Sequence, residues 1–229
     1  MTSSLLIGGI IFSEMDQTDF TCPFEVLSRV PGSKFLVIAK TPEPVRDMKG
    51  LILTPEFSFA DTPALDVLLV PGGSGVNALM EDPITLDFIR KQAAHAKLIL
   101  TVCTGALIFG ATGLLKGRRA TTHWASRHML PSLGAILQEE RVVQDGNLIT
   151  TAGVTAGLDG ALLAASVLCG EDEAKAIQLY LEYAPNPPFH SGTPDTAPPA
   201  ILKKVQTDYI NVVKAREQII ERLTTSKAW

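Results

Sequence analysis

The stretch "LILTVCTGALIFGATGLL", residues 98–115, decides the fold because two patterns meet inside it. Its first residues form a continuous apolar run that is typical of a buried strand, and its later residues follow a helical pattern. Cys103 stands at the junction, and Gly105 permits the sharp turn that a strand-to-helix junction needs. The stretch therefore predicts a strand, a turn that carries a cysteine, and a helix.

The same alternation continues on both sides of this stretch. Apolar runs at 5–12, 35–41, 66–70 and 97–102 are separated by helix-length segments, and continuous apolarity is typical of parallel strands that are covered on both faces. We therefore predict a doubly covered α/β fold with a mostly parallel sheet. In such a sheet the ligand crevice lies beyond the carboxyl ends of the strands, where Cys103 falls.

The expected helices have start signals or helical spacing. Thr21 is expected to cap a helix over 22–30, and Asp82 with Pro83 predicts a helix over 83–95. Further helices are expected over 104–115, 156–168, 171–183 and 200–224, the last of them long and amphipathic, and "RVVQDGNLIT" (141–150) predicts a β-hairpin.

Length and composition favour one domain that acts on a small molecule. The 229 residues, 46% hydrophobic and 19% charged, suffice for a single core over 1–229, with a proline-rich loop at 184–200. The formal charge of −4, with scattered lysine and arginine, argues against nucleic acid as a partner. No apolar run approaches the ~18–20 residues that span a bilayer, and no export signal is visible, so we expect a cytoplasmic protein without a membrane partner.

Cys103 is the first candidate for chemistry. Backbone N–H groups and the dipole at the start of the following helix are expected to favour its thiolate, which is the reactive form. The alternative is that Cys103 is only a small buried hydrophobe. Cys22 and Cys169 lie far from it in sequence, so neither a disulfide nor a metal site is predicted.

Asp19 is the second candidate, in the loop 13–20 after the first strand. A carboxyl group close to a thiolate is expected to have a raised pKa because like charges repel, and it can then donate a proton near neutral pH. The alternative is an ordinary solvated aspartate. Asp16 lies in the same loop but is the weaker candidate.

Three further segments adjoin this edge of the sheet. The glycine-rich turn "VPGGSGVNAL" (70–79) predicts backbone N–H groups that face the thiol, and a dinucleotide fingerprint is disfavoured because no acidic residue ends the next strand. The segment 150–163 suits either close backbone approach to a pocket or helix–sheet packing. His123 is either the base of a Cys–His pair or a packed histidine.

Taken together, "PGGSG", "VCTGALIFGATGLLKGRRATTHW", "DGNLITTAGVTAGLD" and "LEYAPNPPFHSGTPDTAP" resemble the ThiJ/PfpI branch of the class I glutamine amidotransferase-like superfamily, over nearly the whole chain. The resemblance implies a flavodoxin-like sheet with a nucleophile elbow and a homodimer. It implies that Cys103 is the nucleophile, Asp19 its acid–base partner and Thr104 a positioning hydroxyl. Gly72, Gly73 and Val154 would adjoin the substrate, with no cofactor and no metal.

Within this branch, the aspartate of "MDQTDFTCPFEVL" and the segment "EYAPNPPFHSGTPDTAP" resemble the members that hydrate isocyanides. That resemblance implies addition of water to R–N≡C to give an N-substituted formamide through a cysteine thioimidate. The alternatives are an enzyme of the glyoxalase or hydrolase type, which acts on a carbonyl group, and a non-catalytic sensor of a ligand or of redox state. About 30 residues follow the proline-rich loop, too few for a DNA-reading module. Cys22 stands where the family pattern has glycine, so the shape of the pocket is not predicted from the resemblance.

Overall fold

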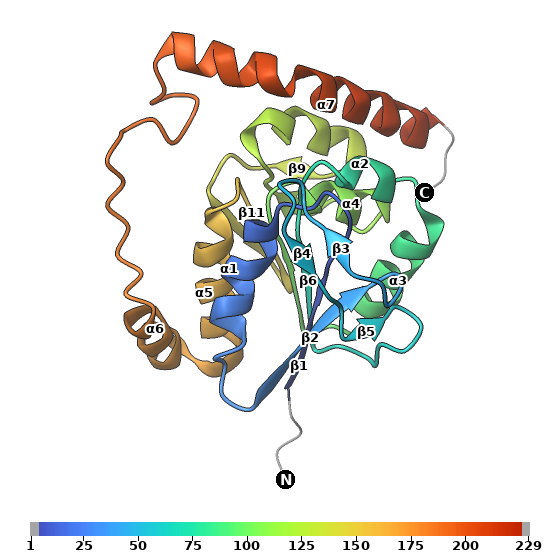
Figure 1. The fold of residues 1–229 in the computed structure, drawn as a ribbon, viewed down its shortest axis with the longest axis vertical. Coiled ribbons are helices and arrows are strands. Elements are labelled where there is room, and N and C mark those ends of the chain that lie inside the picture. Colours follow the sequence, from blue (N-terminus) through green and yellow to red (C-terminus); the bar gives the residue numbers. More distant parts are fainter. Residues whose placement is uncertain (1–4, 226–229) are drawn as a thin grey trace.

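A central sheet organises the computed structural model, which describes residues 5–225 (Figure 1). Its seven strands follow the order β10-β11-β7-β6-β1-β2-β5. β10 pairs antiparallel with β11, and the other neighbours in the sheet run parallel. The strands are β1 (Leu5–Ile10), β2 (Ser33–Ala39), β5 (Phe57–Ser58), β6 (Val67–Val70), β7 (Leu98–Thr101), β10 (Val142–Asp145) and β11 (Leu148–Thr151).

The strand order reverses direction beside β1, which places a crevice there. From β1 the chain moves to β2 on one side and to β6, β7 and β11 on the other. This is the flavodoxin-like order, and ligands bind such sheets beyond the carboxyl ends of the strands at the reversal. The mostly parallel α/β sheet predicted from the apolar runs is therefore confirmed.

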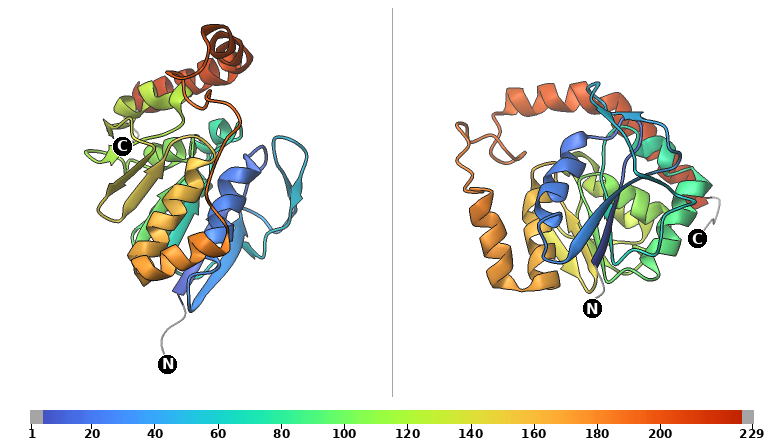
Figure 2. Two further views of the ribbon diagram at one scale, coloured as in Figure 1. Left: turned by 90° about the vertical axis from the view of Figure 1, so that its left-hand side faces the viewer. Right: turned by 60° about the horizontal axis from the view of Figure 1, so that its bottom comes forward.

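Helices cover both faces of the sheet, which explains why every residue of β6, β7 and β11 is buried (Figure 2). On one face α1 packs against α5, and on the other α4 packs against α2 and α3. Their bounds are α1 (Gln17–Leu27), α2 (Val76–Leu79), α3 (Pro83–Ala93), α4 (Gly105–Ala111) and α5 (Ala156–Cys169).

Two short strand pairs and a 3₁₀ helix lie outside the central sheet. The pair β3 (Val45–Arg46) and β4 (Ile52–Leu53) is antiparallel, and β8 (Arg119–Ala120) pairs with β9 (Ile136–Leu137). A 3₁₀ helix, η1 (Trp124–Leu133), follows β8.

The two largest differences from the predicted helix boundaries are at the start of α1 and at the end of α4. α1 begins five residues earlier than expected, at Gln17, because the carboxylate of Asp16 accepts the N–H of Thr18 at 3.0 Å and caps the helix. Thr21 therefore lies inside α1. α4 ends at Ala111, well before residue 115, and Gly113 follows with a φ of 84° that no longer continues a helix.

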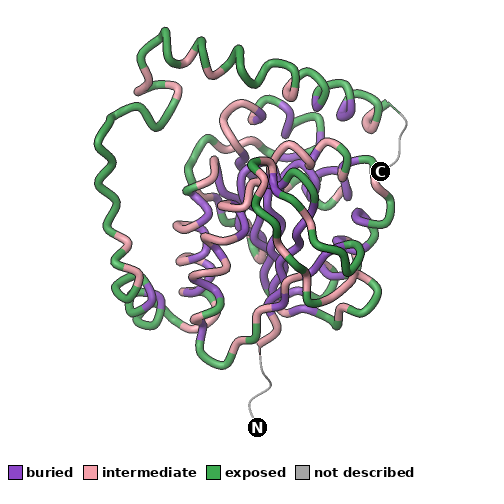
Figure 3. Tube along the Cα trace, in the orientation of Figure 1, coloured by how far each residue is buried: buried purple, intermediate pink, exposed green. Residues whose placement is uncertain are grey.

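The C-terminal part leaves the body and returns to it. After α6 (Glu171–Tyr180) the proline-rich segment runs mostly exposed to α7 (Pro199–Thr225), which packs against η1 and α2 (Figures 1 and 3). α7 is the long helix that was expected, but much of its N-terminal half is exposed, including Tyr209. None of the described helices combines the length and the apolar character that crossing a membrane requires.

Candidate active site

Four loops meet where the parallel strands end. Two hydrogen bonds join neighbouring loops: the N–H of Asp16 donates to the carbonyl of Gly72 at 2.9 Å, and the N–H of Cys103 donates to the carbonyl of Ala152 at 3.0 Å. The loops that follow β1, β6, β7 and β11 thus converge on one point. This convergence brings together the residues that were singled out in four distant parts of the sequence.

Cys103 occupies a strained turn between β7 and α4. Its φ is 54°, a region that non-glycine residues seldom adopt, and its carbonyl accepts the hydroxyl of Thr122 at 2.6 Å. Gly105 is required here because a Cβ at that position would lie 2.1 Å from the carbonyl oxygen of Val70. The turn therefore has the sharp strand-to-helix geometry that the sequence predicted.

Asp19 lies in the first turn of α1, fully buried, with its carboxyl group beside the Cys103 thiol. Its Oδ2 accepts the N–H of Gly72 at 3.0 Å, and Oδ1 is buried without an oxygen or nitrogen partner among residues 5–225. A Cβ on Gly72 would lie 2.8 Å from Asp19 Oδ2 and 2.6 Å from Thr104 Oγ1. Glycine at this position thus lets the carboxyl group approach the elbow.

Burial raises the pKa of Asp19 to about 8, and the negative charge of Asp16 adds to the shift. Hydrogen bonds from the Gly72 N–H and from the Cys103 thiol act in the opposite direction. The direction of the shift is the predicted one, but its main cause is desolvation and not repulsion by a thiolate. Asp19 is a carboxylic acid at neutral pH, and it can donate a proton.

The thiol of Cys103 departs from the sequence prediction of a favoured thiolate. Burial raises its pKa well above the ordinary value, and the charge of Asp19 raises it further. Backbone N–H groups of Val154 and Thr104 donate toward the sulfur and lower the pKa, but they do not outweigh burial. Cys103 and Asp19 are therefore a coupled pair that loses its protons in steps belonging to both groups.

The charge-stabilising N–H groups are not those that were predicted. The N–H of Gly72 is taken by Asp19, and the N–H of Gly73 donates to the Thr104 hydroxyl at 3.1 Å. That hydroxyl in turn donates to the Gly73 carbonyl at 3.3 Å, so Thr104 links the elbow to the glycine turn. The N–H groups that face the sulfur come from Val154 and Thr104 instead.

A small cavity gives access to the sulfur. It has a volume of about 80 Å³, and Gly73 and Val154 line it, whereas Gly72 does not. A larger cavity of about 660 Å³ lies next to it and shares His123 and Val154, but Cys103 is not in its wall. The lining of the small cavity comprises Asp16, Met48, Gly73, Ser74, Cys103, Thr104, His123, Ala125, Val154, Tyr209, Val212, Val213 and Arg216.

His123 lines both cavities but does not pair with the thiol. Its Nδ1 accepts the N–H of Ala125 at 3.3 Å, and no hydrogen bond joins it to Cys103 within the described part of the chain. Burial, with the nearby charges of Arg216 and Arg127, lowers the pKa of His123 to about 4. The imidazole is neutral near pH 7 and is a weak base. The geometry favours the packed histidine over a Cys–His pair.

Cys22 lies one helical turn after Asp19, half-buried on α1. Burial and the charge of Asp19 both raise the pKa of its thiol, so it is less acidic than an ordinary cysteine. No group of three or more histidine, cysteine or acidic side chains is arranged for a metal ion between residues 5 and 225.

Arg216 is a site residue that the sequence analysis missed. It projects from α7 into the small cavity and is only 4% exposed. Its guanidinium donates to Asn77 Oδ1 at 2.9 Å, to Ser126 Oγ at 2.9 Å and to the Gly73 carbonyl at 3.2 Å. The signal was an arginine at position 216 within the apolar stripe of the helix, four residues from each of Val212 and Ile220.

Comparison with known proteins agrees with this geometry. The model of the DJ-1/PfpI family matches residues 7–165, which is more than half of the chain. The chain belongs to the DJ-1/PfpI family. The family match ends within α5, so α6, the proline-rich segment and α7 with Arg216 lie beyond it.

Relatives within the DJ-1/PfpI family match to different extents. The isonitrile hydratase of Pseudomonas putida is 51% identical over 219 residues, which cover 96% of each chain. A ThiJ/PfpI family protein from Pseudomonas syringae superposes with a TM-score of 0.92 at 38% identity, covering 95% of this chain and 90% of that one. Drosophila melanogaster DJ-1β superposes with a TM-score of 0.69 at 27% identity, covering 80% and 100%. The fold and the family resemblance read from the sequence are confirmed.

Proposed function

We propose that the protein is an isocyanide hydratase, which adds water to R–N≡C and releases an N-substituted formamide. The observation that carries this proposal is a buried thiol–carboxyl pair, Cys103 and Asp19, at a small cavity. A chain that is 51% identical over nearly its full length is named an isonitrile hydratase, and isonitrile is another word for isocyanide. The same relative supports the assignment to the lyases.

In the proposed first step, the Cys103 sulfur attacks the terminal carbon of the isocyanide. A C–S bond forms, and that carbon receives one proton from the pair, which gives the thioimidate R–N=CH–S–Cys103. Asp19 suits the transfer because a carboxyl group with a pKa of about 8 holds its proton at neutral pH and is close to the sulfur. Covalent catalysis divides a difficult hydration into two easier steps.

In the second step, water attacks the thioimidate carbon. Asp19 took the thiol proton in the first step and now donates it to the nitrogen; of the two water protons, one returns to Asp19 and the other reaches the sulfur as the C–S bond breaks. The products are R–NH–CHO and the free thiol, so the overall balance is one isocyanide plus one water. The N–H groups of Val154 and Thr104 favour negative charge on the sulfur as it leaves.

The test is formamide production, measured by mass spectrometry with an alkyl isocyanide. Cys103→Ala is expected to abolish it, and Asp19→Asn to lower kcat/KM by ~10²–10⁴, since positioned proton transfer contributes that much. Cys169→Ala, at a half-buried thiol outside the cavity, is the matched control and keeps activity. Turnover retained in Cys103→Ala, or turnover of methylglyoxal but not of the isocyanide, contradicts the proposal.

We further infer a homodimer that acts in the cytoplasm. Three apolar side chains in or beside the proline-rich segment are unusually open: Leu179 is 81% exposed, Tyr180 72% and Phe189 79%. A second copy of the chain would cover such a surface.

The cysteines Cys22, Cys103 and Cys169 are all free thiols, which fits a reducing compartment such as the cytoplasm.

A further inference from the structure

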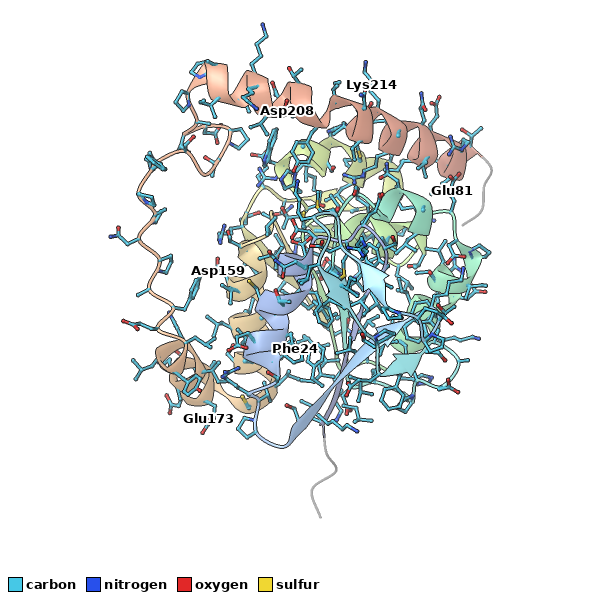
Figure 4. All side chains as sticks on the ribbon, in the orientation of Figure 1. Phe24, Glu81, Asp159, Glu173, Asp208 and Lys214 are labelled. Carbon is cyan, nitrogen blue, oxygen red and sulfur yellow. The ribbon has the colours of Figure 1, made fainter. Side chains whose placement is uncertain are left out.

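Arg216 is a buried cation without an acidic partner. No ion pair joins it to an aspartate or glutamate within residues 5–225, and its hydrogen-bond acceptors are an amide, a hydroxyl and a backbone carbonyl. Arg222, less than two turns further along α7, makes two hydrogen bonds to the carboxylate of Glu81, at 2.8 and 3.0 Å, on an exposed surface. Figure 4 shows Glu81 close to the C-terminal part of α7, and Lys214 on its outer side. Arg222 is thus exposed and paired with a carboxylate, whereas Arg216 is buried and paired only with neutral groups.

A buried charge is costly unless other charges or dipoles compensate it. The three acceptors of Arg216 supply dipoles but no net negative charge. A charged arginine that lines a cavity therefore stabilises any negative charge that forms there. Cys103 lines that same cavity; burial lowers the pKa of Arg216, and a negative charge on the Cys103 sulfur opposes that shift because it interacts favourably with the guanidinium.

The other ionisable groups around the pair do not supply this cation. Asp19 and Asp16 are carboxyl groups, and Cys22 is a thiol whose own pKa is raised. His123 is neutral near pH 7, because its pKa is about 4. Arg127, on η1, is close enough to His123 to affect it, but it is not part of the small cavity's lining. Arg216 is the cation of that lining.

We propose that Arg216 is a positioning residue that stabilises the negative charge of the Cys103–Asp19 pair and thereby sets the pH at which the thiol becomes reactive. The inference rests on the site of the proposed function and adds a residue to it. Arg216 acts through its charge, and through the Gly73 carbonyl it also holds the turn that contacts Thr104. It comes from a helix that the family match does not include.

The neutral side chain at position 77 is consistent with this role. Asn77 Oδ1 accepts from Arg216 Nε at 2.9 Å, and its amide nitrogen donates to the Val212 carbonyl at 3.3 Å. An aspartate of the same size at this position would neutralise the guanidinium. With asparagine, the positive charge is oriented by a hydrogen bond and remains available to the cavity.

The experiment measures the rate at which iodoacetamide alkylates Cys103 in the full chain, from pH 5 to 11, with the modified peptide identified by mass spectrometry; because the pKa of the thiol is raised, the rates below the midpoint are compared as well as the midpoint itself. Arg216→Gln is expected to move the midpoint of this profile up by about one pH unit or more, because a nearby cation lowers an acid's pKa by about that much. The rate at pH 7 then falls about tenfold. Arg216→Lys is expected to restore most of the shift, and Arg222→Gln to leave the midpoint unchanged.

Asn77→Asp removes the net charge while Arg216 stays in place, so it decides the question even if Arg216→Gln fails to fold. The proposal predicts that its midpoint also rises. A midpoint equal to that of the parent in Asn77→Asp overturns the proposal, as does an equal shift in Arg216→Lys and Arg216→Gln. Alkylation needs no isocyanide, so a chain that shows these shifts but makes no formamide refutes the proposed function and leaves this inference standing.

Discussion

At the scale of single residues, the sequence positions of Cys103 and Asp19 were enough to predict that the two groups meet, but not to predict their pKa values. Cys103 and Asp19 follow strands that end at the same edge, and this order is visible in the sequence. The pKa of each group depends on how deeply packing buries it, and depth of burial has no local signal. The helix that follows Cys103 lowers its pKa through the Thr104 N–H, but desolvation dominates.

The raised pKa of Asp19 predicts a pH dependence of stability. The group has a pKa of 3.8 when unperturbed and about 8 in the fold, so between these values the unfolded chain releases a proton that the folded chain keeps. The contribution of Asp19 to stability therefore falls as pH rises from about 4 to 8. Asp19→Asn lacks this loss, and its Tm relative to the parent is expected to rise over that range.

Thermal unfolding at closely spaced pH values measures this difference. Asp172→Asn, at an exposed position of α6, is the control for loss of a carboxyl group. A Tm difference between Asp19→Asn and the parent that stays constant, or falls, from pH 4 to 8 shows that Asp19 is not buried as a carboxylic acid.

At the scale of elements, the start of a helix was predictable where the sequence offers only one N-cap residue. Asp82 caps α3 through Thr85, as its sequence predicted, because Pro83 can occupy only the first turn. At α1 both Asp16 and Thr21 are suitable caps, and the earlier one is used. The choice is made by tertiary contact, since the Asp16 N–H is held by the Gly72 carbonyl.

The elbow between β7 and α4 predicts a steric effect at Gly105. A methyl group there would collide with the Val70 carbonyl, so Gly105→Ala is expected to lower the free energy of unfolding by ~2–3 kcal/mol. Urea denaturation measures the change. Gly192→Ala, where a Cβ meets open space, is the matched control and is expected to change stability by less than ~0.5 kcal/mol. Equal stability of the two variants contradicts the close approach.

At the scale of the whole molecule, the long C-terminal helix was predictable but its role was not. Its helical spacing is plain in the sequence, whereas its position over the cavity depends on packing against η1 and α2. Arg216 therefore enters the site from more than a hundred residues beyond Cys103. The sequence likewise predicts a loop at the proline-rich segment, but only the structure shows that this segment runs exposed and apart from the body of the chain (Figure 3).

The exposed apolar side chains predict the oligomeric state. Light scattering is expected to give twice the 24.5 kDa of one chain. Phe189→Asp combined with Leu179→Glu is expected to weaken the dimer, because charge then enters a surface that a second copy covers. Ile84→Asp, on the exposed side of α3, is the control and leaves the dimer intact. A parent protein that elutes as a monomer at high concentration contradicts the inference.

Mass spectrometry of protein quenched with acid during turnover tests most directly whether the Cys103 sulfur forms a covalent bond to an isocyanide carbon. We predict a mass increase equal to that of the isocyanide, located on the peptide that contains Cys103 and lost as formamide appears. Formamide that accumulates while this peptide stays unmodified, or an adduct on Cys22 alone, would contradict covalent catalysis by Cys103.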